Sequence, residues 1–93
     1  MKFDSIGERD WYKTLELLEL AGEISELKTQ VKFPVVINNV KVCSYIADYT
    51  YKDKQGKYIV EDFKGVQTSI FKLKKKLMKA VHGIDVLLTF KKK

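Results

Sequence analysis

The stretch that decides the fold is residues 40–64, which read VKVCSYIADYTYKDKQGKYIVEDFK. Residues 40–51 and 58–64 are rich in β-branched and aromatic side chains, which favour strands. Between the two runs stands Asp53-Lys54-Gln55-Gly56, a combination typical of a turn. The stretch therefore predicts an antiparallel hairpin of two strands.

A helix and an extended segment are expected before this hairpin. Residues 6–21 carry an apolar stripe at helical spacing, and Gly22 is a usual stop signal for a helix. The stripe consists of Trp11, Leu15 and Leu18. Residues 24–37 read as extended structure interrupted at Pro34, and Asn38-Asn39 predicts a turn into the hairpin.

A second helix and a last strand are expected after the hairpin. Thr68 or Ser69 can cap a helix over residues 69–81, which ends at His82-Gly83. Its apolar face is expected to hold Ile70, Leu73, Leu77 and Val81. Residues 84–90 then form the last strand. The order α-β-β-β-α-β in a single domain, residues 1–93, predicts a mixed α/β fold with a central mixed sheet flanked by two helices.

Composition narrows the class of protein. The 93 residues suffice for one domain, and the 45% of hydrophobic residues exclude a disordered chain. A single cysteine excludes both a disulfide framework and a cysteine-based zinc site. The sequence has neither an apolar run of about 20 residues nor the apolar stretch of a signal peptide. We therefore expect a soluble cytoplasmic protein without a membrane partner.

Charge is distributed unevenly along the chain, whose net charge is +6. Residues 1–33 hold five basic and seven acidic residues, whereas residues 34–93 hold thirteen basic and five acidic residues. This basic half favours a polyanion such as nucleic acid, although lysine-rich surfaces also serve solubility alone. Because 17 of the 18 basic residues are lysine, we expect contacts to phosphates and recognition of DNA shape rather than of bases.

Two carboxylates of the hairpin lie where packing alone would not put them. Asp62 and Lys64 occupy the same side of the second strand, and Asp48 lies in the apolar run of the first strand. Two aspartates within reach of each other are costly to bury unless a cation compensates them, and oxygen ligands suit Mg²⁺ or Mn²⁺. Lys64 could then stabilise charge on a phosphoryl group. The alternative is a solvated sheet face on which the acids pair with lysines.

Glu8 is a third candidate acid. The 3.6-residue repeat places it close to Trp11 and Leu15, so we expect it to point towards the sheet. Its spacing from Ser5 also fits a capping box, which would give Glu8 a purely structural role.

Together these residues resemble the PD-(D/E)XK nuclease superfamily. The signature reads Ala47-Asp48, then Asp62-Phe63-Lys64, with a glutamate on the preceding helix. Gly7-Glu8-Arg9 is similar to the glutamate–arginine pair in the first helix of archaeal-type Holliday-junction resolvases. The likeness is greatest to small phage-encoded members and covers nearly the whole chain. It departs from the common pattern at Ala47, where many members have proline.

The resemblance implies a restriction-endonuclease-like core and a Mg²⁺- or Mn²⁺-dependent endonuclease acting on branched DNA, in phage DNA recombination or processing in a bacterial host cell. It assigns catalysis to Glu8, Asp48, Asp62 and Lys64. It makes Asp48, Asp62 and the Phe63 backbone carbonyl metal ligands, with Glu8 binding directly or through water. Glu61 adjoins Asp62, so strand register decides which of the two acids serves the metal.

The remaining candidates are residues for DNA contact and for assembly. The candidate DNA-binding residues are Arg9, Gln67, Lys72, Lys75, Lys76, Lys79, Lys91, Lys92 and Lys93. A solvated helix face explains the lysines of residues 72–79 equally well. The short chain and the symmetry of a four-way junction predict a homodimer. A catalytically inactive DNA-binding module with the same fold, or a scaffold protein, remains the alternative to an enzyme.

Overall fold

The computed structural model describes residues 6–63 and 67–89. Helix α1 (Ile6–Leu20) leads into β1 (Ile24–Ile37), β2 (Val40–Asp53) and β3 (Tyr58–Phe63). Helix α2 (Ser69–Leu77) continues as a π-helical turn, η1 (Met78–His82), and β4 (Leu87–Thr89) ends the described chain. The strands form one sheet in the order β1-β2-β3-β4, in which only the β3–β4 pair is parallel. The expected mixed α/β class is confirmed.

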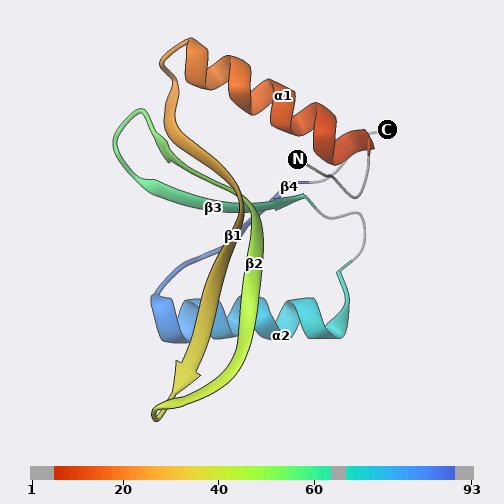
Figure 1. Ribbon diagram of the computed structural model, residues 1–93, viewed down its shortest axis with the longest axis vertical. Coiled ribbons are helices and arrows are strands. Elements are labelled where there is room, and N and C mark those ends of the chain that lie inside the picture. Colours follow the sequence, from red (N-terminus) through yellow and green to blue (C-terminus); the bar gives the residue numbers. More distant parts are fainter. Residues whose placement is uncertain (1–5, 64–66, 90–93) are drawn as a thin grey trace.

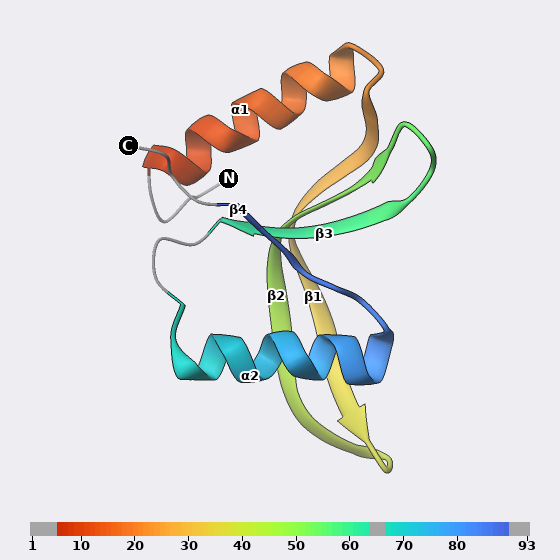
Figure 2. The same ribbon diagram turned by 180° about the vertical axis from the view of Figure 1, so that it is seen from behind.

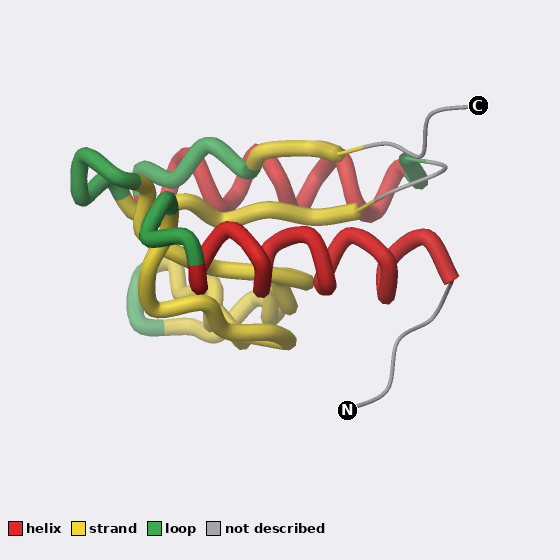
Figure 3. The backbone as a smooth tube through the Cα atoms, turned by 90° about the horizontal axis from the view of Figure 1, so that it is seen from above, coloured by secondary structure: helices red, strands yellow, loops and turns green. Residues whose placement is uncertain are grey.

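The two helices lie on opposite sides of β3 and β4 (Figures 1 and 2). Seen from above, both helices run alongside these two strands (Figure 3). Each helix covers its own apolar cluster. The cluster on the α2 side contains Tyr45, Ala47, Val60, Phe71, Met78 and Val86. The cluster on the α1 side contains Leu15, Ile24, Tyr49 and Tyr51, with Trp11 and Leu18 packed against them.

The β1–β2 hairpin bends between these two clusters. Tyr45 and Ala47 contact the α2 cluster, whereas Tyr49 and Tyr51 contact the α1 cluster, although all four share one side of β2. The switch from one cluster to the other lies between Ala47 and Tyr49, which pair with Val31 and Thr29 of β1. Gln30, between these two β1 residues, has φ 53°. The bend therefore faces Asp48, the first of the candidate metal ligands.

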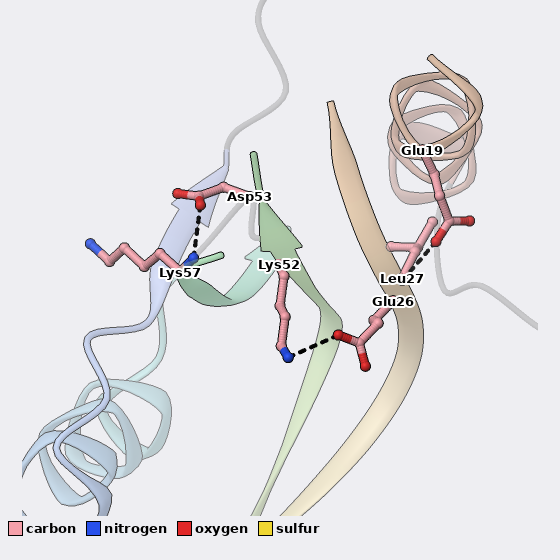
Figure 4. A network of polar contacts seen from close by, with 6 residues as sticks. All are labelled: Glu19, Glu26, Leu27, Lys52, Asp53 and Lys57. Carbon is pink, nitrogen blue, oxygen red and sulfur yellow. Dashed lines mark hydrogen bonds and ion pairs between the residues drawn. The ribbon is translucent and has the colours of Figure 1, made fainter. Parts of the chain in front are cut away.

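A bulge in β1 ties the start of this strand to helix α1 (Figure 4). Glu26 has φ 55°, and the register shifts between Ser25 and Lys28. The Leu27 N–H donates to the Glu19 carboxylate of α1 at 2.9 Å. Glu26 in turn forms an ion pair of 2.9 Å with Lys52 of β2. The bulge thus links β1 to α1 through Glu19 and to β2 through Lys52.

The turns and helix ends follow the expected residues. Asp53 Oδ1 accepts the Lys57 N–H (Figure 4) and also the Gln55 N–H, which closes the predicted β2–β3 turn. Thr68 caps α2, because its hydroxyl accepts the Phe71 N–H at 3.1 Å. Gly83 ends η1 with φ 69°, in the left-handed region that glycine occupies most readily. The predicted caps of α2 are thus confirmed.

Several expected boundaries were wrong. β1 runs through Pro34 without interruption, because β1 is an edge strand, where the missing N–H is tolerated. The first helix ends at Leu20, one residue early, and β2 extends to Asp53. The last strand is only Leu87–Thr89, since it pairs with β3 over three residues.

The apolar face expected for the second helix was wrong at Ile70 and Leu73, whereas Leu77 and Val81 are half-buried. Ile70 and Leu73 are 68% and 58% exposed, whereas Phe71 and Met78 are buried. Phe71 and Met78 are seven residues apart, two helical turns, and both pack in the cluster with Tyr45 and Val86. The helix is therefore rotated so that Phe71 and Met78 face the sheet.

Candidate functional site

The site is built where the β2–β3 ladder ends. The last paired residues are Tyr49 and Glu61. Beyond them the Asp48 N–H donates to Asp62 Oδ1 at 2.8 Å, and the Phe63 N–H donates to Asp48 Oδ2 at 2.9 Å. The two aspartate side chains thus take the place of the next backbone-to-backbone pair. This exchange brings the two carboxylates together across the strands, as the hairpin register predicts.

Both aspartates are withdrawn from solvent. Asp48 is 8% exposed and Asp62 is fully buried. Backbone N–H donors satisfy part of each carboxylate, but two neighbouring negative charges repel each other strongly where water is excluded. A solvated sheet face, the alternative interpretation of these acids, does not describe this arrangement.

Glu8 comes to the same region from helix α1. Its side chain is 4% exposed, as expected for a residue that points towards the sheet. The Tyr49 hydroxyl donates to the Glu8 backbone carbonyl, which fixes the start of α1 on β2. Burial raises the pKa of Tyr49, and the Glu8 and Asp48 carboxylates raise it further. Both acids therefore act on the same tyrosine hydroxyl.

Glu61 has a different environment from Asp62. Its fully buried carboxylate accepts hydrogen bonds from the Trp11 indole, the Tyr51 hydroxyl and the Thr89 hydroxyl. These donors come from α1, β2 and β4, so Glu61 joins three elements to β3. Of the two adjacent acids, the register gives Asp62 to Asp48 and assigns Glu61 to a structural network.

The buried tyrosines predict how stability depends on alkaline pH. Burial raises the pKa of Tyr51 above its ordinary value of about 10, and the hydrogen bond to Glu61 adds to this. The same holds for Tyr49, beside Glu8 and Asp48. The unfolded chain therefore releases these protons first, so stability is retained below pH of about 10 and falls above it.

We expect the tyrosinate absorbance of Tyr49 and Tyr51 to appear together with the loss of far-ultraviolet circular dichroism during an alkaline titration. Ionisation of all five tyrosines before any loss of helix signal would contradict the prediction.

The candidate DNA contacts are only partly within the described residues. Lys72, Lys75 and Lys76 line one shallow hollow on α2. Lys79 forms an ion pair of 2.9 Å with Asp85, which reduces its positive charge towards a ligand. Arg9 is exposed and Gln67 half-buried. Ser5, Lys64, Lys91, Lys92 and Lys93 lie outside the described residues.

The donor atoms present fit a hard divalent cation. Within residues 6–63 and 67–89, no three histidine, cysteine or acidic side chains converge as a ligand group. Mg²⁺, however, retains several waters and is commonly held by one or two carboxylates. The paired carboxylates of Asp48 and Asp62, next to the Phe63 backbone, supply ligands of that type.

Reasoning from the sequence missed the Glu61 network. The signal was present, since Glu61 shares its side of the strand with Ile59 and Phe63, and two tyrosines alternate on the strand beside it. Trp11 was assigned only to the apolar stripe of α1, and the hydrogen bond of its indole to Glu61 was not foreseen. His82 ends the helix as expected, and its Nε2 also hydrogen-bonds to the Pro34 carbonyl at 2.8 Å, a contact that the sequence did not indicate.

The molecule is thus a helix–sheet–helix protein of the mixed α/β class with a buried pair of aspartates at a strand junction. The family model described as "Protein of unknown function (DUF1064)" matches residues 1–93, and the chain belongs to this family. No curated protein matches the chain. No solved structure matches it. No helix among the described residues is long and apolar enough to cross a membrane.

Proposed function

We propose that the protein is a metal-dependent DNA endonuclease of the PD-(D/E)XK type that hydrolyses phosphodiester bonds, with branched DNA as its substrate. The observation that carries the proposal is the pair of carboxylates, Asp48 and Asp62, buried side by side where β2 and β3 stop pairing. Two like charges in such a place repel each other, and a positive charge close to both lowers the cost of burying them. A divalent cation would provide it and would give the pair a chemical role.

Each site residue has a distinct part in this proposal. Asp48, Asp62 and the Phe63 backbone carbonyl would hold Mg²⁺ or Mn²⁺, with Glu8 binding directly or through water. The bound ion would polarise the scissile phosphate and favour attack by water. Lys64, which the resemblance makes the catalytic lysine, would stabilise the charge that develops on the phosphoryl group.

The basic half of the chain supports DNA as the ligand. The exposed Lys72 and Lys76 and the half-buried Lys75 share one hollow on α2, where they can contact a phosphate backbone. A four-way junction has two-fold symmetry. We therefore extend the proposal to a homodimer whose two sites make paired cuts. Affinity for DNA would then fall steeply with salt, because counterion release dominates binding of this kind.

A cleavage assay tests the proposal. Four-way, flap, nicked and linear DNAs are incubated with Mg²⁺, Mn²⁺ or EDTA, and we expect cleavage of branched DNA with either metal and none with EDTA. Calorimetric titration with Mn²⁺ should show binding to the wild type that Asp48→Asn weakens at least tenfold. Equal Mn²⁺ affinity in both proteins would contradict the proposed metal site at Asp48. Binding to DNA without cleavage under any condition would leave the inactive DNA-binding module instead.

A further inference from the structure

The distal part of the β1–β2 hairpin, residues 33–46, forms an arm that extends past helix α2 (Figures 1 and 2). The base of this arm is held firmly. His82 Nε2 bonds the Pro34 carbonyl at 2.8 Å, the rings of Phe33 and His82 are 6.1 Å apart, and Val35 is fully buried. Beyond Val35 the arm has no cover from the rest of the described chain. Its tip therefore projects from a base that contacts η1 through His82.

The tip exposes apolar side chains that a projecting hairpin does not need for folding. Ile37 and Val40 pair across the last step of the ladder and are 41% and 63% exposed. Val36 and Val42 next to them are 43% and 53% exposed. Asn38 and Asn39 make the turn with φ 49° and 65°, which brings these side chains to the very end of the arm.

Charge on and beside the arm favours an anionic ligand. The arm, residues 33–46, contains Lys41 and no aspartate or glutamate, and Lys28 and Lys32 lie on β1 just before its base. All three lysines are exposed. An apolar tip that carries Lys41 and no acidic residue complements a polyanion that also offers apolar surface. Nucleic acid with accessible base faces has both properties.

A second copy of the chain fits this arm poorly. Pro34 lacks an N–H group, and the positive φ values of Glu26 and Gln30 interrupt the free edge of β1. Such features prevent one edge strand from pairing with another. A symmetric contact through the tip would also bring the same lysines of both copies together.

We propose that the apolar tip of the arm inserts at an unstacked base step of DNA and thereby selects branched over linear duplex. A two-stranded β-ribbon fits a DNA groove, and apolar wedges that separate base pairs are used by many DNA-bending proteins. Opening a step in linear duplex costs a few kcal/mol, whereas stacking at a branch point is already interrupted. This inference rests on the proposed function for its substrate and adds the device that recognises it.

The test compares two double variants of the full chain in EDTA. Ile37→Ser/Val40→Ser changes the tip, and the matched control Leu17→Ser/Leu20→Ser changes two exposed leucines of α1, which are 66% and 85% exposed. Fluorescence anisotropy measures binding to a four-way junction and to linear duplex, and 2-aminopurine at the branch reports unstacking. Both variants change exposed side chains only, so they should melt as the wild type does.

The tip variant should bind the junction about tenfold more weakly, as expected for losing roughly one buried valine, and should bind duplex almost unchanged. The 2-aminopurine signal should rise with the wild type and the control and not with the tip variant. Wild-type junction affinity in the tip variant would overturn the inference. Conversion of a dimer to a monomer by the tip change, measured by light scattering, would overturn it too, since the tip would then join two copies.

The outcome for the arm can be separated from that for the nuclease. If the wild type cleaves DNA with metal and the tip variant binds the junction normally, the proposed role of the arm is rejected and the proposed function is retained. If junction binding depends on the tip but no DNA is cleaved, the proposed role of the arm is retained and the proposed endonuclease activity is rejected. Absence of DNA binding by the wild type would reject the arm directly.

Discussion

Asp62→Asn is expected to lower the rate of Mg²⁺-dependent DNA cleavage by about 10²–10³-fold while the protein remains folded. Asparagine retains an oxygen at the position that accepts the Asp48 N–H, so the contact between β2 and β3 survives. What disappears is one of the two negative charges that would hold the metal. Single-turnover cleavage at saturating protein measures the effect on the chemical step.

The matched control for this variant is Asp10→Asn, which removes the same charge from an exposed position on α1. It should cleave at the wild-type rate, and both variants should melt within a few degrees of the wild type. If the Asp62→Asn protein cleaves as fast as the control, Asp62 does not take part in the reaction and another residue must do so. An Asp62→Asn protein that fails to fold would leave Asp48→Asn and its Mn²⁺ affinity as the measure of the site.

Glu61→Ala is expected to reduce the free energy of unfolding by about 3–5 kcal/mol. The substitution leaves the Trp11 indole and the hydroxyls of Tyr51 and Thr89 without their shared acceptor in a fully buried place. Hydrogen bonds to a charged group contribute about 1.5–3 kcal/mol each, and the three are not additive. For a domain whose total stability is roughly 5–15 kcal/mol, this loss is large.

Glu61→Gln is the informative companion to this variant. Its amide oxygen can still accept from Trp11 and Thr89, and the Tyr51 hydroxyl can turn to accept from its NH₂ group. We expect a loss of only about 1 kcal/mol, measured by urea denaturation of both variants. If Mn²⁺ affinity fell as sharply in Glu61→Gln as in Asp48→Asn, Glu61 would be part of the metal site as well as of the structural network.

The hairpin is the part of the fold that sequence reasoning predicted best. Strand-forming runs on both sides of Asp53-Lys54-Gln55-Gly56 predict the hairpin by local turn chemistry, which in turn places Asp48 near Asp62. Turn geometry acts over a few residues, so it can be read without knowing the rest of the molecule. The order of helices and strands was predicted for the same reason.

The second helix shows where this reasoning fails. Apolar residues occur around much of α2, and their spacing alone favoured Ile70 and Leu73 as the buried face. The structure buries Phe71 and Met78, because these two side chains meet the apolar surface made by Tyr45, Ala47 and Val60. The shape of that surface depends on strands distant in the sequence.

The sequence by itself determined the order of the elements, the hairpin and the proximity of Asp48 to Asp62, since each depends on periodicity and on turns between neighbouring residues, whereas the exact register came from the structure. Only the tertiary structure decided which side of α2 is buried and that Glu61 collects donors from α1, β2 and β4. It also decided how far β4 extends and that the arm beyond Val35 stands clear of both helices. These features require contacts between segments up to 50 residues apart, such as Trp11 with Glu61, and no local pattern encodes how such segments meet.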